Sequence, residues 1–213
     1  MRIRLGLAAL SLVGGFGLAS FSTSAATAAT CTDIDVVAAR GTFEPGTLGA
    51  IVGDPVYSAL QKKLAGRTLS SYKVDYPADL SLTSAAQGNA DLVNHVTSQA
   101  SACPAQRFVL VGYSQGANVV DNSIGISSAG ALVGSPIVAT IPGALEPRVA
   151  AVLLFGNPIR ALGKSVTGTY QSRTVDFCAD GDPVCQSGGD DVLAHLGYTA
   201  DADAAAVFAA GRV

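Results

Sequence analysis

Five short runs of apolar residues alternate along the chain with longer stretches in which small and apolar residues recur every three or four positions. Short continuous runs between turn-forming residues are typical of buried strands, and the longer periodic stretches are typical of helices. The predicted strands are residues 33–39, 71–76, 107–113, 149–156 and 173–178. Strands that alternate with helices in this way indicate a parallel sheet built from βαβ units.

Helices are predicted between these strands and after the last one. The first should begin near Pro55, because proline suits the first turn of a helix. The others cover residues 84–101, 114–124 and 201–211. Five parallel strands with helices on both faces make an α/β fold, a three-layer α/β/α sandwich, for which 2-1-3-4-5 is a common strand order.

The first 29 residues differ from the rest of the chain. Two arginines precede an apolar stretch that runs to about Phe21, and small residues follow up to Ala29. This layout is typical of a secretory signal peptide with a small-residue cleavage site. A transmembrane anchor is the alternative, but the stretch is short for a membrane span and glycines interrupt it. We therefore expect a signal peptide at residues 1–29, and a single secreted domain without a stable membrane anchor at residues 30–213.

The charge of the exported part argues against a nucleic-acid partner. Of the 13 Lys and Arg residues two lie before residue 29, which leaves 11 against 16 Asp and Glu residues. Phosphate binding needs clustered cations, and no basic run is longer than Lys62–Lys63. We expect no nucleic acid among the partners of this protein.

All four cysteines, Cys31, Cys103, Cys178 and Cys185, lie in the predicted exported part. An even number in an oxidising compartment indicates two disulfides, for which three pairings are possible. If the first and third strands are neighbours, Cys31 and Cys103 lie at the same edge of the sheet. Cys178 and Cys185 follow the last strand, at the opposite edge. A zinc site is disfavoured, because the chain has no CxxC pair and only two histidines.

The segment "VGYSQGA" places Ser114 between two glycines, directly after a predicted strand and before a predicted helix. A plain structural turn is one interpretation. The other is the nucleophile elbow, G-x-S-x-G, in which small Gly112 and Gly116 allow a sharp bend that leaves the serine hydroxyl at the carboxyl end of the strand. The flanking strand and helix are the context that the elbow requires, so we favour that interpretation.

A serine hydroxyl needs a base to become a nucleophile. His95 lies within a predicted helix upstream of Ser114 and is interpreted as an ordinary helix residue. His195 follows the last strand, where a loop can return over the edge of the sheet. The order Ser, then Asp, then His is the one that α/β-hydrolase enzymes use. His195 is therefore the predicted base.

The acid that orients this histidine should lie between the serine and the base. The candidates are Asp176, Asp180, Asp182, Asp190 and Asp191. Asp176 is placed within the last strand, and Asp190 and Asp191 are close to His195 in sequence. Asp180 and Asp182 lie in "CADGDPVC", where a small ring could hold a carboxylate in place. Spacing alone leaves these two nearly tied.

The exported part of the chain resembles the cutinases, a family of small secreted serine esterases. The resemblance rests on "ARGTFEPGTLG", "GYSQGA", "CADGDPVC" and "HLGY", in the order that the family has. It implies a five-stranded α/β/α sandwich and a catalytic triad of Ser114, Asp182 and His195, since the family's acid occupies the fifth position of C-x-x-x-D-x-x-C. It also implies the disulfides Cys31–Cys103 and Cys178–Cys185.

The same resemblance implies an oxyanion hole. One donor is the backbone N–H of Gln115, which the elbow also requires, and the other is Thr42 in the loop after the first strand. The predicted reaction is ester hydrolysis through an acyl-enzyme, with no cofactor and no metal.

The expected substrates are cutin-type polyesters, short- to medium-chain esters or lipid esters, and we expect a monomer. The alternatives are a lipase or phospholipase, an acyltransferase that acts on envelope lipids, and an inactive secreted binding protein. Residues 123–143 are long, apolar and rich in Gly and Ser. They are interpreted as a lid, a wall for an acyl chain, or an ordinary surface loop.

Overall fold

The computed structural model of the protein describes residues 31–213. The predicted signal peptide therefore lies outside the described residues. Within them, no helix is both long enough and apolar enough to cross a membrane.

The described chain forms one five-stranded parallel sheet in the order β2-β1-β3-β4-β5. This is the strand order considered from the sequence. The strands are β1 (Ile34–Ala39), β2 (Leu69–Lys73), β3 (Arg107–Tyr113), β4 (Val149–Phe155) and β5 (Thr174–Phe177). Four of the five agree with the prediction to within one residue at each end.

The second strand differs from its prediction, residues 71–76. β2 begins at Leu69 and ends at Lys73, and its pairing with β1 continues for one more bond, from the N–H of Val74 to the carbonyl of Ala38. The next N–H, that of Asp75, donates to the carboxylate of Asp91 instead. The apolar pattern persists beyond the strand because Val74 and Tyr76 are buried in the core.

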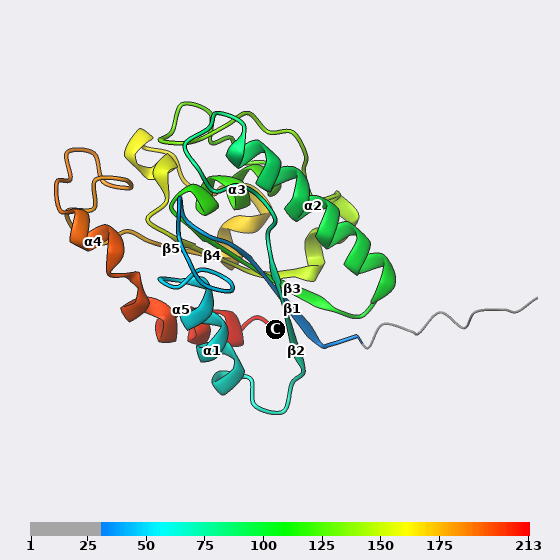
Figure 1. Ribbon diagram of the computed structural model, residues 1–213. Helices are drawn as coiled ribbons and strands as arrows, with labels where there is room; N and C mark the ends of the chain where they lie inside the picture. The colour runs from blue at the N-terminus through cyan, green and yellow to red at the C-terminus, as the bar shows by residue number, and fades with distance from the viewer. Residues whose placement is uncertain (1–30) are drawn as a thin grey trace, which may run out of the picture.

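Helices cover both faces of the sheet, as Figure 1 shows: α2 and α3 lie on one face, and α1 and α5 on the other. Their bounds are α1 (Gly53–Lys63), α2 (Ser84–Ala102), α3 (Gln115–Ser123), α4 (Val192–Leu196) and α5 (Ala202–Ala210). Short 3₁₀ helices complete the chain: η1 (Gly143–Arg148), η2 (Pro158–Leu162), η3 (Gly168–Arg173) and η4 (Tyr198–Asp201). The first helix begins two residues before Pro55. Proline is tolerated there because the first N–H groups of a helix have no partner within it.

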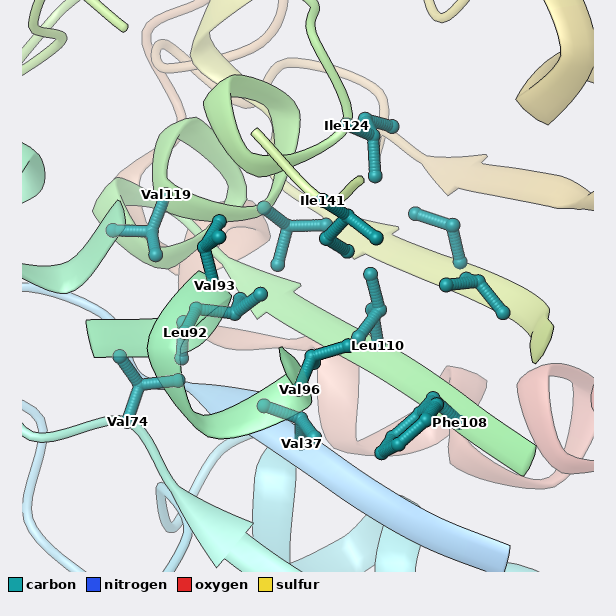
Figure 2. Packing of buried hydrophobic residues seen from close by; sticks show 14 of the residues in the cluster. Val37, Val74, Leu92, Val93, Val96, Phe108, Leu110, Val119, Ile124 and Ile141 are labelled. Carbon is teal, nitrogen blue, oxygen red and sulfur yellow. The ribbon is translucent and has the colours of Figure 1, made fainter. Parts of the chain in front are cut away.

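Two apolar clusters fill the space between the three layers. Alternate residues of β1 belong to different clusters: Val37 packs under α2 and α3, while Val36 packs toward α1 and α5. Figure 2 shows the first cluster, in which Val37 and Leu110 from the sheet lie beside Leu92 and Val96 of α2. Strands buried on both faces need continuous apolar runs, which is why the central strands β1, β3 and β4 could be predicted from the sequence.

Both disulfides have the pairing that the resemblance implies. Cys31 is bonded to Cys103, and this bridge joins the segments that lead into the adjacent strands β1 and β3. Cys178 is bonded to Cys185, in the loop that follows β5.

Candidate active site

Ser114 occupies the bend between β3 and α3. Its backbone has φ 54° and ψ −119°, a combination that costs a non-glycine residue on the order of 1–3 kcal/mol. Two hydrogen bonds hold the bend: the N–H of Ser114 donates to the carbonyl of Phe155 in β4, and the N–H of Ala117 donates to the carbonyl of Ser114, both over 2.9 Å. The surrounding fold therefore keeps the serine in a strained conformation at the tip of β3.

Glycine at position 116 lets α3 approach the sheet. A Cβ atom placed there would lie 1.9 Å from the carbonyl oxygen of Ala39 at the end of β1. A Cβ at Gly112 would lie 2.7 Å from the carbonyl oxygen of Gly116. Both glycines of G-x-S-x-G are thus required by close backbone approach, which is the reason given for them from the sequence.

His195 lies between Ser114 and Asp182. Its Nε2 is 3.0 Å from Oγ of Ser114, and its Nδ1 is 2.8 Å from Oδ2 of Asp182. The histidine belongs to the short helix α4, and its backbone carbonyl accepts a hydrogen bond from the hydroxyl of Tyr113. The ring also needs Gly156 beside it, because a Cβ there would lie 2.7 Å from Cε1 of His195.

Asp182 is fully buried inside the small ring that the Cys178–Cys185 bridge closes. Burial raises the pKa of its carboxyl group, but hydrogen bonds from Tyr198, His195 and the N–H of Val184 outweigh burial, so the pKa lies below its ordinary value. The carboxylate is therefore charged at neutral pH and faces the imidazole. Asp180, nearly tied with Asp182 on spacing, is exposed.

The other candidate residues have different partners. Asp176 lies in β5 and accepts a hydrogen bond from Asn157. Asp191 caps the start of α4, and Asp190 is exposed. His95 bonds through Nε2 to Asp35 of β1 over 2.7 Å and stacks on Tyr72.

The two predicted oxyanion donors lie beside the serine. Gln115 is the first residue of α3, so its backbone N–H has no partner within the helix. Thr42 follows β1 and lines the same cavity as Ser114. The N-terminus of a helix also stabilises negative charge through its aligned peptide dipoles.

Glu44 organises the loop that carries Thr42. Its buried carboxyl group accepts hydrogen bonds from the N–H of Gly41 over 2.6 Å and from the N–H of Ile51 over 2.7 Å. Burial raises the pKa of Glu44, and these backbone donors oppose the rise. The loop is also tied to the neighbouring segment by the bond from the N–H of Phe43 to the carbonyl of Ala78.

A cavity of about 420 Å³ opens at the serine. Its polar lining residues are Ser114, His195, Thr42, Glu44 and Tyr113. Apolar side chains make most of the remaining wall, among them Phe43, Leu80, Leu132 and Leu196. A small polar group at the floor of an apolar cavity suits a ligand that has one reactive polar centre and an apolar chain.

Leu132 belongs to residues 123–143, which are held against α2 and α3 by buried amide side chains. Asn118 of α3 donates to the carbonyl of Leu132, and Asn122 donates to the carbonyl of Ser135. Asn89 of α2 accepts hydrogen bonds from the N–H groups of Val138 and Ala139. Through Leu132 and Val133 the segment forms part of the cavity wall. That this wall receives an acyl chain stays a prediction.

A family model described as Cutinase matches residues 30–213. The chain belongs to the cutinase family. It is 44% identical to a cutinase of Kineococcus radiotolerans over 195 residues, which make up 87% of this chain and 63% of that protein. It is 41% identical to phospholipase Culp4 of Mycobacterium tuberculosis over 187 residues, which make up 86% of this chain and 80% of that protein.

The fold also matches the solved structure of a Trichoderma reesei cutinase in complex with a phosphonate inhibitor. The TM-score is 0.69 at 35% sequence identity, and the match covers 85% of this chain and 76% of that one. This cutinase-family chain thus spans less than two thirds of the length of the Kineococcus relative, and a larger share of the other two proteins.

Sequence reasoning missed two polar residues of this cutinase-family site. Glu44 was visible only as part of "RGTFEPG", and Tyr198 only as the last residue of "HLGY". In each case the only sign of a role was a polar side chain inside a family motif, and the sequence did not indicate what that side chain would bond to. Among the described residues, no three His, Cys, Asp or Glu side chains lie together as a metal site would require.

Proposed function

We propose that this protein is a serine-dependent carboxylic ester hydrolase, with Ser114 as nucleophile, His195 as base and Asp182 as the acid that orients the base. The observation that carries the proposal is the continuous contact from Oγ of Ser114 to Nε2 of His195, over 3.0 Å, and from Nδ1 to Asp182, over 2.8 Å. A serine within hydrogen-bond reach of a histidine that a carboxylate orients is the arrangement that activates a hydroxyl.

The reaction begins when Ser114 attacks the ester carbonyl while His195 takes the hydroxyl proton. Asp182 stabilises the imidazolium that forms. The carbonyl oxygen becomes negative and accepts hydrogen bonds from the backbone N–H of Gln115 and from Thr42. Each donor of this kind typically contributes about 3–4 kcal/mol of transition-state stabilisation.

The imidazolium then gives its proton to the departing alcohol, which leaves the acyl group bonded to Oγ of Ser114. A water molecule attacks this acyl-enzyme, and His195 takes a proton from the water as it did from the serine. The second tetrahedral intermediate collapses, the carboxylic acid leaves, and Ser114 recovers its proton. All steps use groups of this chain and water.

The substrate class follows from the apolar wall of the cavity. Leu80, Leu82 and Leu132 are 66%, 91% and 60% exposed, and Leu80 and Leu132 line the cavity at Ser114. Exposed apolar side chains around a reactive centre favour esters with an acyl chain, presented singly or on a polyester or lipid surface. The phospholipase relative from Mycobacterium tuberculosis makes hydrolysis of phospholipid esters the second candidate.

The setting of the reaction belongs to the same proposal. The protein is secreted and acts in an oxidising compartment, which its two disulfides suit. One chain supplies the nucleophile, the base and the acid, so the proposed reaction needs no second copy of the protein.

A series of ester substrates tests this function. The proposal predicts hydrolysis of p-nitrophenyl butyrate and octanoate in solution, with lower kcat/KM for palmitate, and loss of all three activities in Ser114→Ala. Phosphatidylcholine vesicles form a separate arm, and preference for them over the soluble esters would favour the phospholipase candidate. Absence of hydrolysis in every arm by a folded protein would contradict the proposed function.

A further inference from the structure

Tyr198 is a buried residue that the reaction described above does not use. It begins η4, and its side chain is 1% exposed. Its hydroxyl donates a hydrogen bond to Oδ2 of Asp182 over 2.5 Å. This is the same oxygen that faces Nδ1 of His195 over 2.8 Å, so the acid of the proposed triad has a second donor beside the imidazole.

The direction of the hydroxyl proton is fixed by a third group. The backbone N–H of Ala179 donates to the hydroxyl oxygen of Tyr198 over 2.9 Å. Because an amide N–H can only donate, it occupies a lone pair of the oxygen. The hydroxyl proton then goes to Oδ2 of Asp182, a charged acceptor that is closer than Sγ of Cys185 at 3.4 Å. Burial, together with the hydrogen bond to Asp182, raises the pKa of Tyr198 far above its ordinary value, so the phenol keeps this proton at any pH at which the enzyme works.

The second oxygen of the carboxylate is also held. Oδ1 of Asp182 accepts a hydrogen bond from the N–H of Val184 over 2.7 Å. Donors on both oxygens fix the rotation of the carboxylate and favour its charged form, even though the group is fully buried. Without the donor from Tyr198, burial would act against that charge with less opposition.

Tyr198 is itself held rigidly. Its ring meets the rings of Phe155 and Tyr113 edge to face, each at a centroid distance of 6.0 Å. It follows His195 by three residues, so a single turn of chain presents the imidazole and the phenol to one carboxylate oxygen. The spacing of "HLGY" therefore has a physical reason that the sequence alone did not supply.

We propose that Tyr198 is a positioning residue of this site, whose hydroxyl holds Asp182 in the orientation and the charged state that His195 requires. The inference rests on the proposed function. It differs from a purely structural role, in which the phenol would only fill space in the core.

The variant Tyr198→Phe removes the hydroxyl and keeps the ring. The expected result is a kcat about tenfold lower with KM within twofold of the wild type. The acid limb of the pH profile of kcat/KM should also move to higher pH by about one unit. A hydrogen bond to a charged group is worth about 1.5 kcal/mol, which corresponds to about one pKa unit. Without the donor from Tyr198, the carboxylate of Asp182 binds a proton more tightly. This holds for a proton on the carboxylate itself and for the proton that it shares with the imidazole of His195.

Two further variants separate positioning from structure. Tyr170→Phe alters another buried tyrosine, which packs against Arg173 away from the site, and its pH profile should match that of the wild type. In an Asp182→Ala background, adding Tyr198→Phe should change kcat less than twofold, because the group on which the hydroxyl acts is gone. An equal loss of kcat in both backgrounds, with an unmoved acid limb, would leave Tyr198 a structural residue and overturn the inference.

Loss of the hydroxyl also leaves the N–H of Ala179 without its partner, which can impair folding. Site-specific incorporation of meta-fluorotyrosine at position 198 keeps both contacts and makes the phenol a stronger donor. The acid limb should then move to lower pH, opposite to the Phe variant, and a shift in the same direction as that variant contradicts the inference. The proposed function fails separately, if Ser114→Ala keeps its activity.

Discussion

Asp121 of α3 is fully buried, and the half-buried Asp176 of β5 lies close enough for its charge to act on Asp121. Burial and the neighbouring charge of Asp176 raise the pKa of Asp121 well above its ordinary value. Burial raises the pKa of Asp176 to about 6, although Arg160 and Asn157 oppose the rise. The side chain of Asp176 is bonded to Asn157, and among the described residues neither aspartate is hydrogen-bonded to a member of the proposed triad.

At the residue scale this pair makes stability depend on pH. A carboxyl group with a higher pKa in the folded chain stabilises the fold fully below its unfolded value, about 4, and this contribution is lost as pH rises through the folded value. Between pH 5 and pH 7, the free energy of unfolding of the wild type should fall by about 1 kcal/mol more than that of Asp176→Asn. Urea unfolding at the two pH values measures the difference.

The matched control is Asp190→Asn, which removes the same charge from an exposed position. Its stability should follow the wild type at both pH values. If the free energy of unfolding of Asp176→Asn falls between pH 5 and pH 7 by as much as that of the wild type, the raised pKa of Asp176 is wrong.

At the scale of elements, the helix that carries His195 is short. α4 has only five residues, and its start is capped by Asp191, whose Oδ1 accepts hydrogen bonds from the N–H groups of Leu193 and Ala194. Helices of this length depend on such caps and on tertiary contacts, because one turn of hydrogen bonds does not stabilise itself. The cap therefore contributes to where the imidazole lies.

Replacing the cap should weaken the site without destroying it. An N-cap residue typically contributes about 1 kcal/mol, so Asp191→Ala should lower kcat by at most about fivefold. The exposed neighbour offers a control, since Asp190→Ala removes a charge but no cap and should leave kcat unchanged. A loss on the order of 10⁴-fold in Asp191→Ala would instead identify Asp191 as the acid that orients the histidine.

At the scale of the whole molecule, the central strands β1, β3 and β4 could be predicted from the sequence because they are apolar on both faces. The edge strand β2 is polar and half-exposed, and its predicted bounds were displaced. The bend at Ser114 could be predicted too, since Gly112 and Gly116 are glycines that only close backbone approach explains. These features are local in sequence. The helix that carries the base was not predicted, because α4 shows no periodic pattern over its five residues.

Contacts between distant segments could not be predicted in this way. Spacing left Asp180 and Asp182 nearly tied, and in the fold it is Asp182 that turns inward, to Tyr198 and His195. The bond from the hydroxyl of Thr199 to the carbonyl of Ile51, across 148 residues, likewise ties the region of α4 and η4 to the loop after β1. Resemblance to a family supplied the choice of acid that the spacing could not.

The central claim is that Ser114 is the nucleophile, and labelling with a phosphonate ester tests it most directly. A phosphonate traps an activated serine as a stable adduct, which mass spectrometry of the digested protein locates. The account predicts one adduct per chain, on Ser114, with loss of esterase activity in proportion to labelling and no adduct in Ser114→Ala. An adduct at another residue, or full activity in a protein labelled at Ser114, would contradict it.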